Sequence, residues 1–324
     1  MKTLLLHIGL GKTGSTSIQL ALENIPGSMK DGTSYPRAPL ETQLLGDYLV
    51  QALKEPALPP EMNIGNLLNK LFQGSGLYIM SSESIGHSLD CHKTALLNAF
   101  IAFFDRIEII AYVRDPMLWN CKVYAQMHLD FPLFDLLDCP YLVTQSALLR
   151  TFNDYAENFP AVNLNVFAYE AACSHAKGLL GHFISEVARI FPSSDLSPQL
   201  NLPTRSDSFA NQKLTVGQYV CAARMRDIAN ISGADISYVP PDWSSLVIGE
   251  GCGSDLLFPF SHIESIAVVS KYDSICLKND FGIDSSDSGA SIDLLSKAQP
   301  AIKQLYDEYL ECSTYESCIR LLAS

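Results

Sequence analysis

The chain has 324 residues, 48% of them hydrophobic, and its 22 Lys and Arg against 35 Asp and Glu give a net charge of −13. This apolar content predicts a substantial core and excludes general disorder. An acidic chain repels polyphosphate backbones, so nucleic acid is not expected as a partner, and any anionic ligand needs a local positive pocket.

The nine cysteines are scattered, and no C-x-x-C pair occurs among them. Clustered spacing would be needed for a disulfide framework or a zinc site, so we expect reduced thiols, no metal and a cytoplasmic location. The apolar start, Met1 to Leu10, is interrupted by His7 and lacks a cleavage site, which favours a buried strand over a signal peptide. No stretch has the apolar length of a transmembrane helix.

Strands and helices are predicted to alternate along the chain. The run Leu4–Ile8 is typical of a strand buried on both faces, and a helix is expected from Ser17 to Ile25. A loop is expected at 31–39, strands at 77–80, 107–113 and 164–169, and helices at 41–53, 63–72, 117–130, 142–159 and 178–191. This order predicts an α/β fold, with a central parallel sheet, right-handed crossovers and a three-layer α/β/α arrangement.

The pattern is weaker after residue 201. Helices are expected near 212–228 and 262–278, and a Ser- and Asp-rich loop at 284–289. Because there is no internal repeat and no linker, residues 1–324 are predicted to form a single domain with a helical C-terminal portion at about 201–324.

The turn after the first strand has the composition of an anion site. Its glycines let the backbone approach a ligand, and the following helix directs N–H groups and a positive dipole end at the same point. Lys12 adds a cation and four hydroxyls add donors, the alternative being an ordinary Ser-capped helix. A Walker A loop is excluded because Leu6 stands where its first Gly is required. The candidate binding residues are Gly11, Lys12, Thr13, Gly14, Ser15, Thr16 and Ser17.

The segment His7-Ile8-Gly9-Leu10-Gly11-Lys12-Thr13-Gly14-Ser15-Thr16-Ser17 resembles the 5′-phosphosulfate loop of bacterial sulfotransferases that use 3′-phosphoadenosine 5′-phosphosulfate (PAPS). The run Ile109-Ile110-Ala111-Tyr112-Val113-Arg114-Asp115-Pro116 resembles the strand that leads to the 3′-phosphate site of this family. The resemblance implies a P-loop-like nucleotide-binding fold of sulfotransferase type, with PAPS as co-substrate and no metal. It covers the first half of the chain.

In the family, the Arg at this strand end and a Ser eight residues later bind the 3′-phosphate. Arg114 matches, whereas the Ser position is Lys122, which can still bind a phosphate as a point charge or can mark an altered pocket. The alternative for Arg114 is a structural pair with a carboxylate such as Asp115. Weaker likenesses are Tyr78 to Glu83, whose Ser-Ser-Glu lies near the sulfate in relatives, and Asn201 to Ser208. The Gly-rich C-terminal cofactor loop of the family has no match.

Sulfuryl transfer needs a stabilised leaving group and a base for the acceptor proton. Lys12 is the expected leaving-group stabiliser. Glu83, at a strand end, is the preferred base, and its alternative is a helix-capping role. His87 is the second candidate base. His7 is expected to be a core residue bonded to neighbouring backbone.

The predicted function is therefore sulfuryl transfer to a hydroxyl or amine of a small-molecule, carbohydrate or lipid acceptor. Aromatic residues including Tyr35, Phe103, Phe104 and Trp119 either line the acceptor pocket or, more in keeping with their size, belong to the core. Two alternatives stay open at this point. One is a P-loop-like nucleotide kinase, which predicts a Mg²⁺ site with an Asp at a strand end, and the other is a non-catalytic nucleotide-binding relative.

Overall fold

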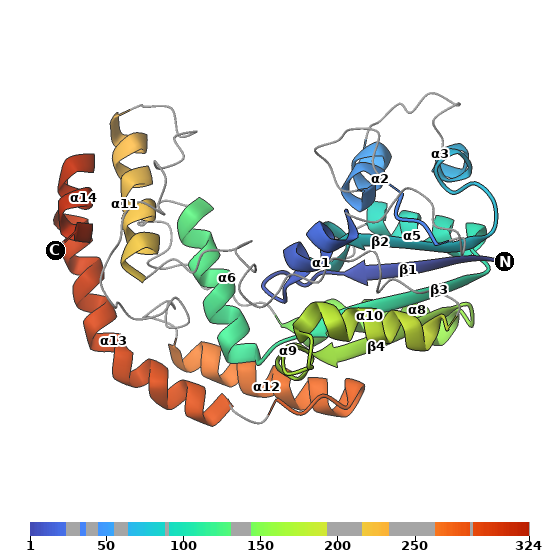
Figure 1. Cartoon of the computed structure of the whole chain (residues 1–324). Helices are drawn as coiled ribbons and strands as arrows, with labels where there is room; N and C mark the ends of the chain where they lie inside the picture. The colour runs from blue at the N-terminus through green and yellow to red at the C-terminus, as the bar shows by residue number, and fades with distance from the viewer. Residues whose placement is uncertain are drawn as a thin grey trace. The chain divides into compact units, whose positions relative to one another are not determined.

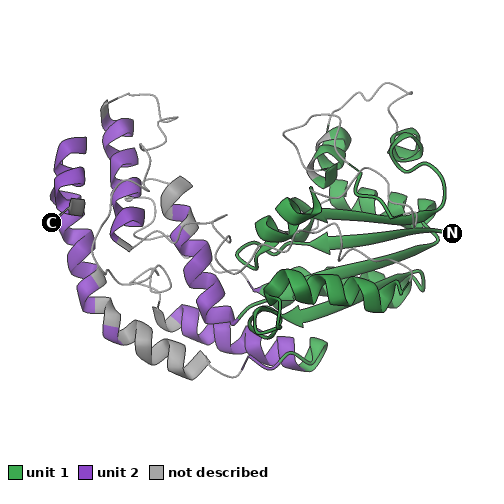
Figure 2. Ribbon diagram, viewed as in Figure 1, with its two compact units in different colours: residues 1–114, 145–210, 279–283 green, residues 115–144, 211–278, 284–324 purple. Residues whose placement is uncertain are grey.

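A computed structural model describes residues 1–23, 33–36, 45–54, 64–87, 91–130, 144–192, 216–232, 263–285 and 288–323. The chain divides into two compact units (Figure 2). The first comprises Met1–Arg114, Gln145–Ala210 and Asn279–Ile283, and the second comprises Asp115–Thr144, Asn211–Lys278 and Asp284–Ser324. The prediction of a single domain is not tested by this division.

A four-stranded parallel sheet forms the centre of the first unit (Figure 1). Its strands lie in the order β2-β1-β3-β4, where β1 is Lys2–Ile8, β2 is Gly76–Ser82, β3 is Arg106–Val113 and β4 is Val162–Ala168. The first three are buried along nearly their whole length, as expected for continuous apolar runs covered on both faces. The α/β fold with a parallel sheet is thus confirmed.

Helices cover both faces of this sheet. On one face, Leu5, Ile79 and Ile110 pack with side chains of α1 (Ser15–Leu22) and α10 (Gly178–Ile190). Because side chains alternate along a strand, Tyr78 points to the opposite face, where it meets the rings of Phe72 and Phe104. The other helices of the unit are α2 (Leu45–Lys54), α3 (Ile64–Leu71), α4 (Glu83–His87), α5 (Cys91–Phe103), α8 (Gln145–Asn158) and α9 (Tyr169–Cys173).

The second unit is helical in its described residues. It contains α6 (Pro116–Asp130), α11 (Val216–Ser232), α13 (Ser288–Glu311), α14 (Tyr315–Ala323) and nearly all of α12 (Ile263–Phe281). Its core gathers Met117, Tyr124, Val220, Tyr306 and Tyr309. Helix α11 contacts α6, α13 and α14, and α13 also contacts α6, so this core is built by helix-on-helix packing.

The predicted elements agree with the structure within a few residues, with some exceptions. The loop expected at 31–39 contains Ser34, which forms a parallel bridge with Tyr78 and so extends the sheet beyond β2. The loop expected at 284–289 is wrong at its end, because α13 already begins at Ser288. The segment Asn201 to Ser208 lies outside the described residues.

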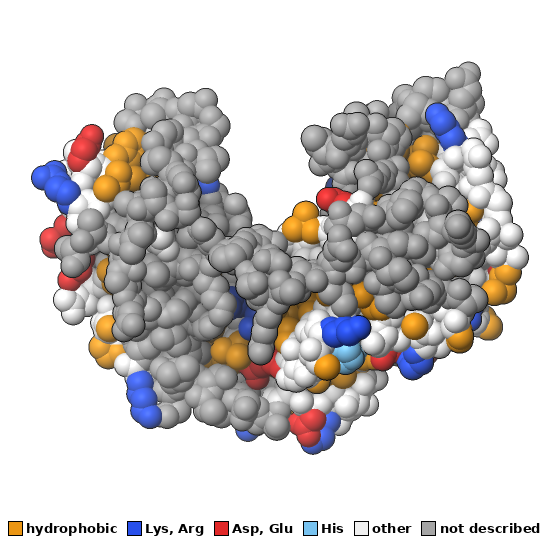
Figure 3. Space-filling view, in the orientation of Figure 1, with side chains coloured by type: hydrophobic (Ala, Val, Ile, Leu, Met, Phe, Trp, Pro, Cys, Tyr) orange, Lys and Arg blue, Asp and Glu red, His pale blue; other side chains and the backbone are white. Residues whose placement is uncertain are grey.

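On the face drawn in Figure 3, the basic and acidic side chains of the described residues are interspersed. Among the described helices, none is long and apolar enough to cross a membrane. No group of three or more His, Cys, Asp or Glu side chains in the described part of the chain could hold a metal ion.

Candidate functional site

The carboxyl ends of three neighbouring strands bring the predicted site segments to one edge of the sheet. Ile8 at the end of β1 pairs with Ser82 of β2 and with Ala111 of β3, so the chain leaves all three strands at nearly the same level. From β1 the chain connects to β2 on one side, and from β2 it returns to β3 on the other side. Open α/β sheets bind ligands at such a switch point, outside the carboxyl ends of the strands.

The backbone of the loop after β1 is held in conformations that favour glycine. Gly11 and Gly14 have φ of 68° and 78°, and Lys12, at 53°, is the one non-glycine residue with positive φ in the described part of the chain. Gly14 is the N-cap of α1, and no side chain caps this helix. Gly14 O accepts hydrogen bonds from Ser17 N and Ile18 N, so the N–H groups of Ser15 and Thr16 are the ones open to an anion.

The side chains of the loop differ in their surroundings. Lys12 and Ser17 are exposed and Thr16 is half-buried. Thr13 is fully buried, and its hydroxyl has no hydrogen-bond partner among the described residues. A buried hydroxyl without a partner costs free energy, which a bound ligand could recover.

Glu83 lies against this loop. The hydroxyl of Ser15, the first residue of α1, donates a hydrogen bond to Glu83 Oε1. Ser82 caps α4, because its Oγ accepts a hydrogen bond of 3.3 Å from Ile85 N, and Glu83 lies in the first turn of this helix. The base role and the helix-terminal role of Glu83 both stay predictions. A methyl group at Gly86 would lie 2.4 Å from Gly9 O, so glycine is required where α4 approaches the loop.

Arg114 follows β3 and reaches the same loop. Its Nη1 donates a hydrogen bond of 3.3 Å to Lys12 O, and its Nε lies 3.2 Å from Glu170 Oε1. Its guanidinium carbon lies 4.9 Å from the ring centre of Tyr169. Arg114 thus pairs with a carboxylate, as its structural alternative expects, but the carboxylate is that of Glu170 rather than Asp115. The Oδ1 of Asp115 accepts a hydrogen bond from Leu118 N in α6.

Tyr169 and Glu170 were not predicted as site residues. Both begin α9 directly after β4, the fourth strand whose carboxyl end lies at this edge. Burial raises the pKa of Tyr169 to about 12, so its ring is neutral under Arg114 at physiological pH. The available signal was their place at the end of a parallel strand, the same position that favoured Glu83 as the base.

The remaining predicted residues have different outcomes. His7 is a fully buried core residue, as expected, but it bonds Ser81 Oγ at 2.8 Å rather than backbone. Burial lowers its pKa to about 4. His87 is the last residue of α4, and Lys122 lies on α6 in the second unit. The roles of His87 and Lys122 stay predictions.

The aromatic residues considered for an acceptor pocket are mostly core. Tyr35, Phe104 and Trp119 are almost fully buried, which agrees with the core interpretation. Phe103 is half-buried and stacks edge-on with Phe104, while Lys2 Nζ lies 4.1 Å from its ring centre.

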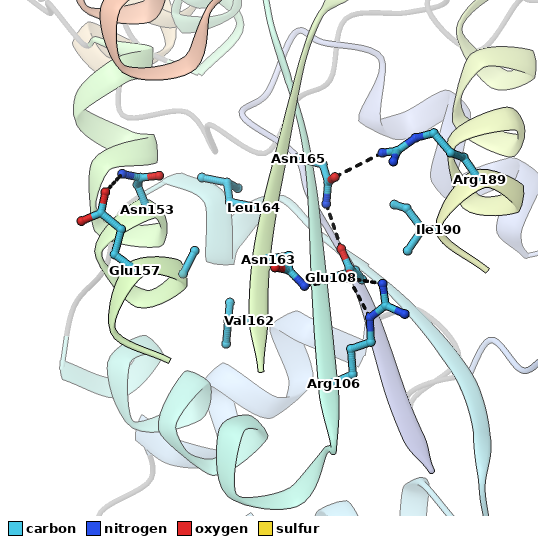
Figure 4. A pocket seen from close by; sticks show the side chains of 11 residues that line it. Arg106, Glu108, Asn153, Glu157, Val162, Asn163, Leu164, Asn165, Arg189 and Ile190 are labelled. Atoms are coloured by element: carbon cyan, nitrogen blue, oxygen red, sulfur yellow. Dashed lines mark hydrogen bonds and ion pairs between the residues drawn. The ribbon is translucent and has the colours of Figure 1, made fainter. Parts of the chain in front are cut away.

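A separate cavity of about 500 Å³ lies beside the amino-terminal halves of β3 and β4 (Figure 4). The buried Glu108 accepts hydrogen bonds there from Arg106, Asn163 and Asn165. Its carboxylate is thus satisfied within the protein. The cavity contains none of the predicted site residues, so we assign this polar cluster to stabilisation of the sheet.

No known protein-family model matches this chain, and no curated protein matches it.

Proposed function

We propose that this protein is a sulfotransferase that transfers a sulfuryl group from PAPS to a hydroxyl or amine of a small-molecule, carbohydrate or lipid acceptor. The observation that carries the proposal is the hydrogen bond from Arg114 Nη1 to Lys12 O. It joins two segments 102 residues apart, the same two that resemble the 5′-phosphosulfate loop and the 3′-phosphate strand. A nucleotide with anionic groups at both its 3′ and 5′ positions needs two adjoining anion sites of this kind.

The donor groups present are suited to such a nucleotide. Uncapped N–H groups of α1, the buried hydroxyl of Thr13 and the exposed Lys12 would hold the 5′-phosphosulfate. Arg114 donates to protein through Nη1, and no acceptor for Nη2 is seen among the described residues. Nη2 would donate to the 3′-phosphate, as guanidinium groups often do.

The residues supply the two electrostatic needs of the reaction. As the acceptor oxygen or nitrogen bonds to sulfur, the bond from sulfur to the 5′-phosphate oxygen breaks, and Lys12 with the α1 N–H groups stabilises the charge on that oxygen. Glu83 accepts the acceptor's proton. Its contact with Ser15 supports this role, because it holds the carboxylate beside the loop.

Binding measurements on two variants test the proposal. Lys12→Ala should reduce transfer by about 10²-fold or more, because it removes the leaving-group stabiliser, and should weaken donor binding. Arg114→Ala should weaken binding of 3′-phosphoadenosine 5′-phosphate by about tenfold or more while barely changing that of AMP. Isothermal titration calorimetry measures both affinities, and radiolabelled sulfuryl transfer measures activity.

Exposed cations elsewhere in the first unit provide matched controls. Lys54→Ala and Arg189→Ala remove the same charges away from the site and should leave both binding and transfer unchanged. If Arg114→Ala lowered the affinities for 3′-phosphoadenosine 5′-phosphate and for AMP by equal factors, the assignment of Arg114 to the 3′-phosphate would be contradicted.

A further inference from the structure

The guanidinium of Arg114 has two edges that can bind an oxyanion through paired N–H groups, Nε with Nη2 and Nη1 with Nη2. One protein oxygen lies near each edge. Lys12 O accepts a hydrogen bond of 3.3 Å from Nη1, whereas Glu170 Oε1 forms an ion pair at 3.2 Å from Nε, which donates no hydrogen bond. A phosphate therefore cannot take either edge in full until one of these oxygens leaves.

The two oxygens differ in what their movement would require of the backbone. The Lys12 carbonyl belongs to the backbone of a loop held in left-handed conformations at Gly11, Lys12 and Gly14. Glu170 is a side chain with 49% of its surface exposed, on the first turn of the short helix α9. Rotation about its side-chain bonds would release the Nε/Nη2 edge without a change of backbone.

The third contact of Arg114 fixes the plane of the guanidinium. Tyr169 covers one face with its ring centre 4.9 Å from the guanidinium carbon. The same ring is held against the loop, because a methyl group at Gly14 would lie 3.3 Å from Tyr169 Cε2. The edge that Glu170 occupies thus keeps its position when the carboxylate leaves.

We propose that Glu170 determines the affinity and selectivity of the site by competing with a ligand phosphate for the Nε/Nη2 edge of Arg114. This inference rests on the proposed function, since the phosphate concerned is the 3′-phosphate of the nucleotide. Glu170 places a negative charge where that phosphate binds, so a ligand must contribute a strong bidentate interaction to displace it.

The test is the substitution Glu170→Gln, which keeps the size of the side chain and removes its charge. The affinity for 3′-phosphoadenosine 5′-phosphate should rise by about tenfold, because a neutral amide competes less for the guanidinium. The affinity for AMP, which lacks the 3′-phosphate, should be unchanged. Calorimetric titration of both nucleotides at constant ionic strength measures the two effects.

Two controls separate competition from a general change of charge. In the Arg114→Ala background, Glu170→Gln should give no gain, because the contested edge is gone. Glu186 forms a comparable pair with Arg189 on α10, with 2.6 Å between Glu186 Oε2 and Arg189 Nε, so Glu186→Gln should leave both affinities unchanged. Circular dichroism and melting temperature would show that each variant is folded.

The outcomes distinguish the inference from the proposed function. If the wild type binds 3′-phosphoadenosine 5′-phosphate but Glu170→Gln binds it equally or more weakly, competition by Glu170 is overturned, and weaker binding assigns the residue to orienting Arg114. If the wild type binds neither nucleotide, the proposed function fails and this inference fails with it.

Discussion

Lys12 has a backbone conformation that costs a non-glycine residue about 1–2 kcal/mol. Lys12 has a φ of 53°. The nearby Gly11 and Gly14 also adopt the left-handed region, which costs glycine little. A residue kept in such a conformation indicates that its side chain matters at that point, since Gly would be more stable there. A cation in the middle of the proposed anion-binding loop would have that value, because the helix dipole alone supplies only about half a charge.

Glu83 gives the most direct chemical prediction at this scale. Glu83→Gln keeps the reach to Ser15 but removes basicity, so turnover should fall by about 10²–10⁴-fold while donor affinity holds. The pH–rate profile should lose its acidic limb, which in the wild type reports deprotonation of the base. Steady-state transfer to an acceptor, followed across pH, measures both. Unchanged turnover would move the role to His87 or to the acceptor itself.

His7 predicts a pH dependence of stability. Its folded-state pKa of about 4 lies below the 6.5 of the unfolded chain, because burial disfavours the charged ring. Between pH 4 and pH 6.5 the unfolded state binds more protons than the folded state. The contribution of the neutral His7 ring to the free energy of unfolding is therefore complete above pH 6.5 and is lost as the pH falls toward 4. The loss should be about 1.4 kcal/mol per pH unit within that window.

His7→Gln isolates this term, because Gln can keep the bond to Ser81 but does not titrate. Urea unfolding at pH 7 and pH 5 should show a smaller loss of stability in the variant than in the wild type. Equal losses in both proteins would mean that His7 is accessible to protons in the folded state.

At the scale of elements, the loop after β1 depends on its contact with α10. A methyl group at Gly14 would lie 2.3 Å from Leu179 Cδ2, and the residue has a φ of 78°. Gly14→Ala should therefore destabilise the protein by about 2–4 kcal/mol, through backbone strain and crowding together, and should weaken nucleotide binding.

Gly74 provides the matched control. It has a similar φ of 84°, but a methyl group there would meet nothing within 4 Å. Gly74→Ala should cost only the backbone strain, about 1–2 kcal/mol, and leave binding unchanged. Chemical denaturation measures both. Equal costs for the two substitutions would show that Leu179 yields easily and that the loop is not fixed by α10.

Strands and helices with a clear hydrophobic pattern were predicted from the sequence. Buried strands such as Ile107 to Val113 form continuous apolar runs, so β1 to β4 were found within a few residues. The helices α5, α9, α13 and α14 were not predicted. α9 has only five residues, and α13 has polar residues along much of its length. A segment as short as α9 is too short to show a helical period in the sequence, because packing rather than local pattern determines it.

The candidate site residues follow strand ends. Gly11 to Ser17 and Glu83 were proposed from local patterns and Arg114 from a resemblance to the 3′-phosphate strand, and parallel pairing of β1 with β2 and β3 brings these segments to one edge. The ion pair of Arg114 with Glu170 was not predictable, because it depends on which strand neighbours β3. Sequence alone gives no strand order. The structure places β4 beside β3, and the carboxylate paired with Arg114 is Glu170, which follows β4, rather than the expected Asp115.

At the scale of the whole molecule, the net charge of −13 opposes the binding of a highly charged nucleotide. The site must overcome that field with local donors. Two carboxylates, Glu83 and Glu170, lie in the same region as its cations Lys12 and Arg114. In the proposed binding mode, affinity would therefore depend on directed N–H groups and on displacement of Glu170 rather than on excess positive charge. Binding should therefore be tighter when the ligand carries both phosphate groups than when it carries one.

The measurement that tests this account most directly is thermal unfolding with nucleotides in the presence and absence of divalent metal. In EDTA, 3′-phosphoadenosine 5′-phosphate at about 100 times its Kd should raise the melting temperature by about 2–4 °C, because ligand binding stabilises the folded state. AMP at the same concentration should raise it less. A shift produced only by ATP with Mg²⁺ would contradict the sulfotransferase proposal and favour a phosphotransferase.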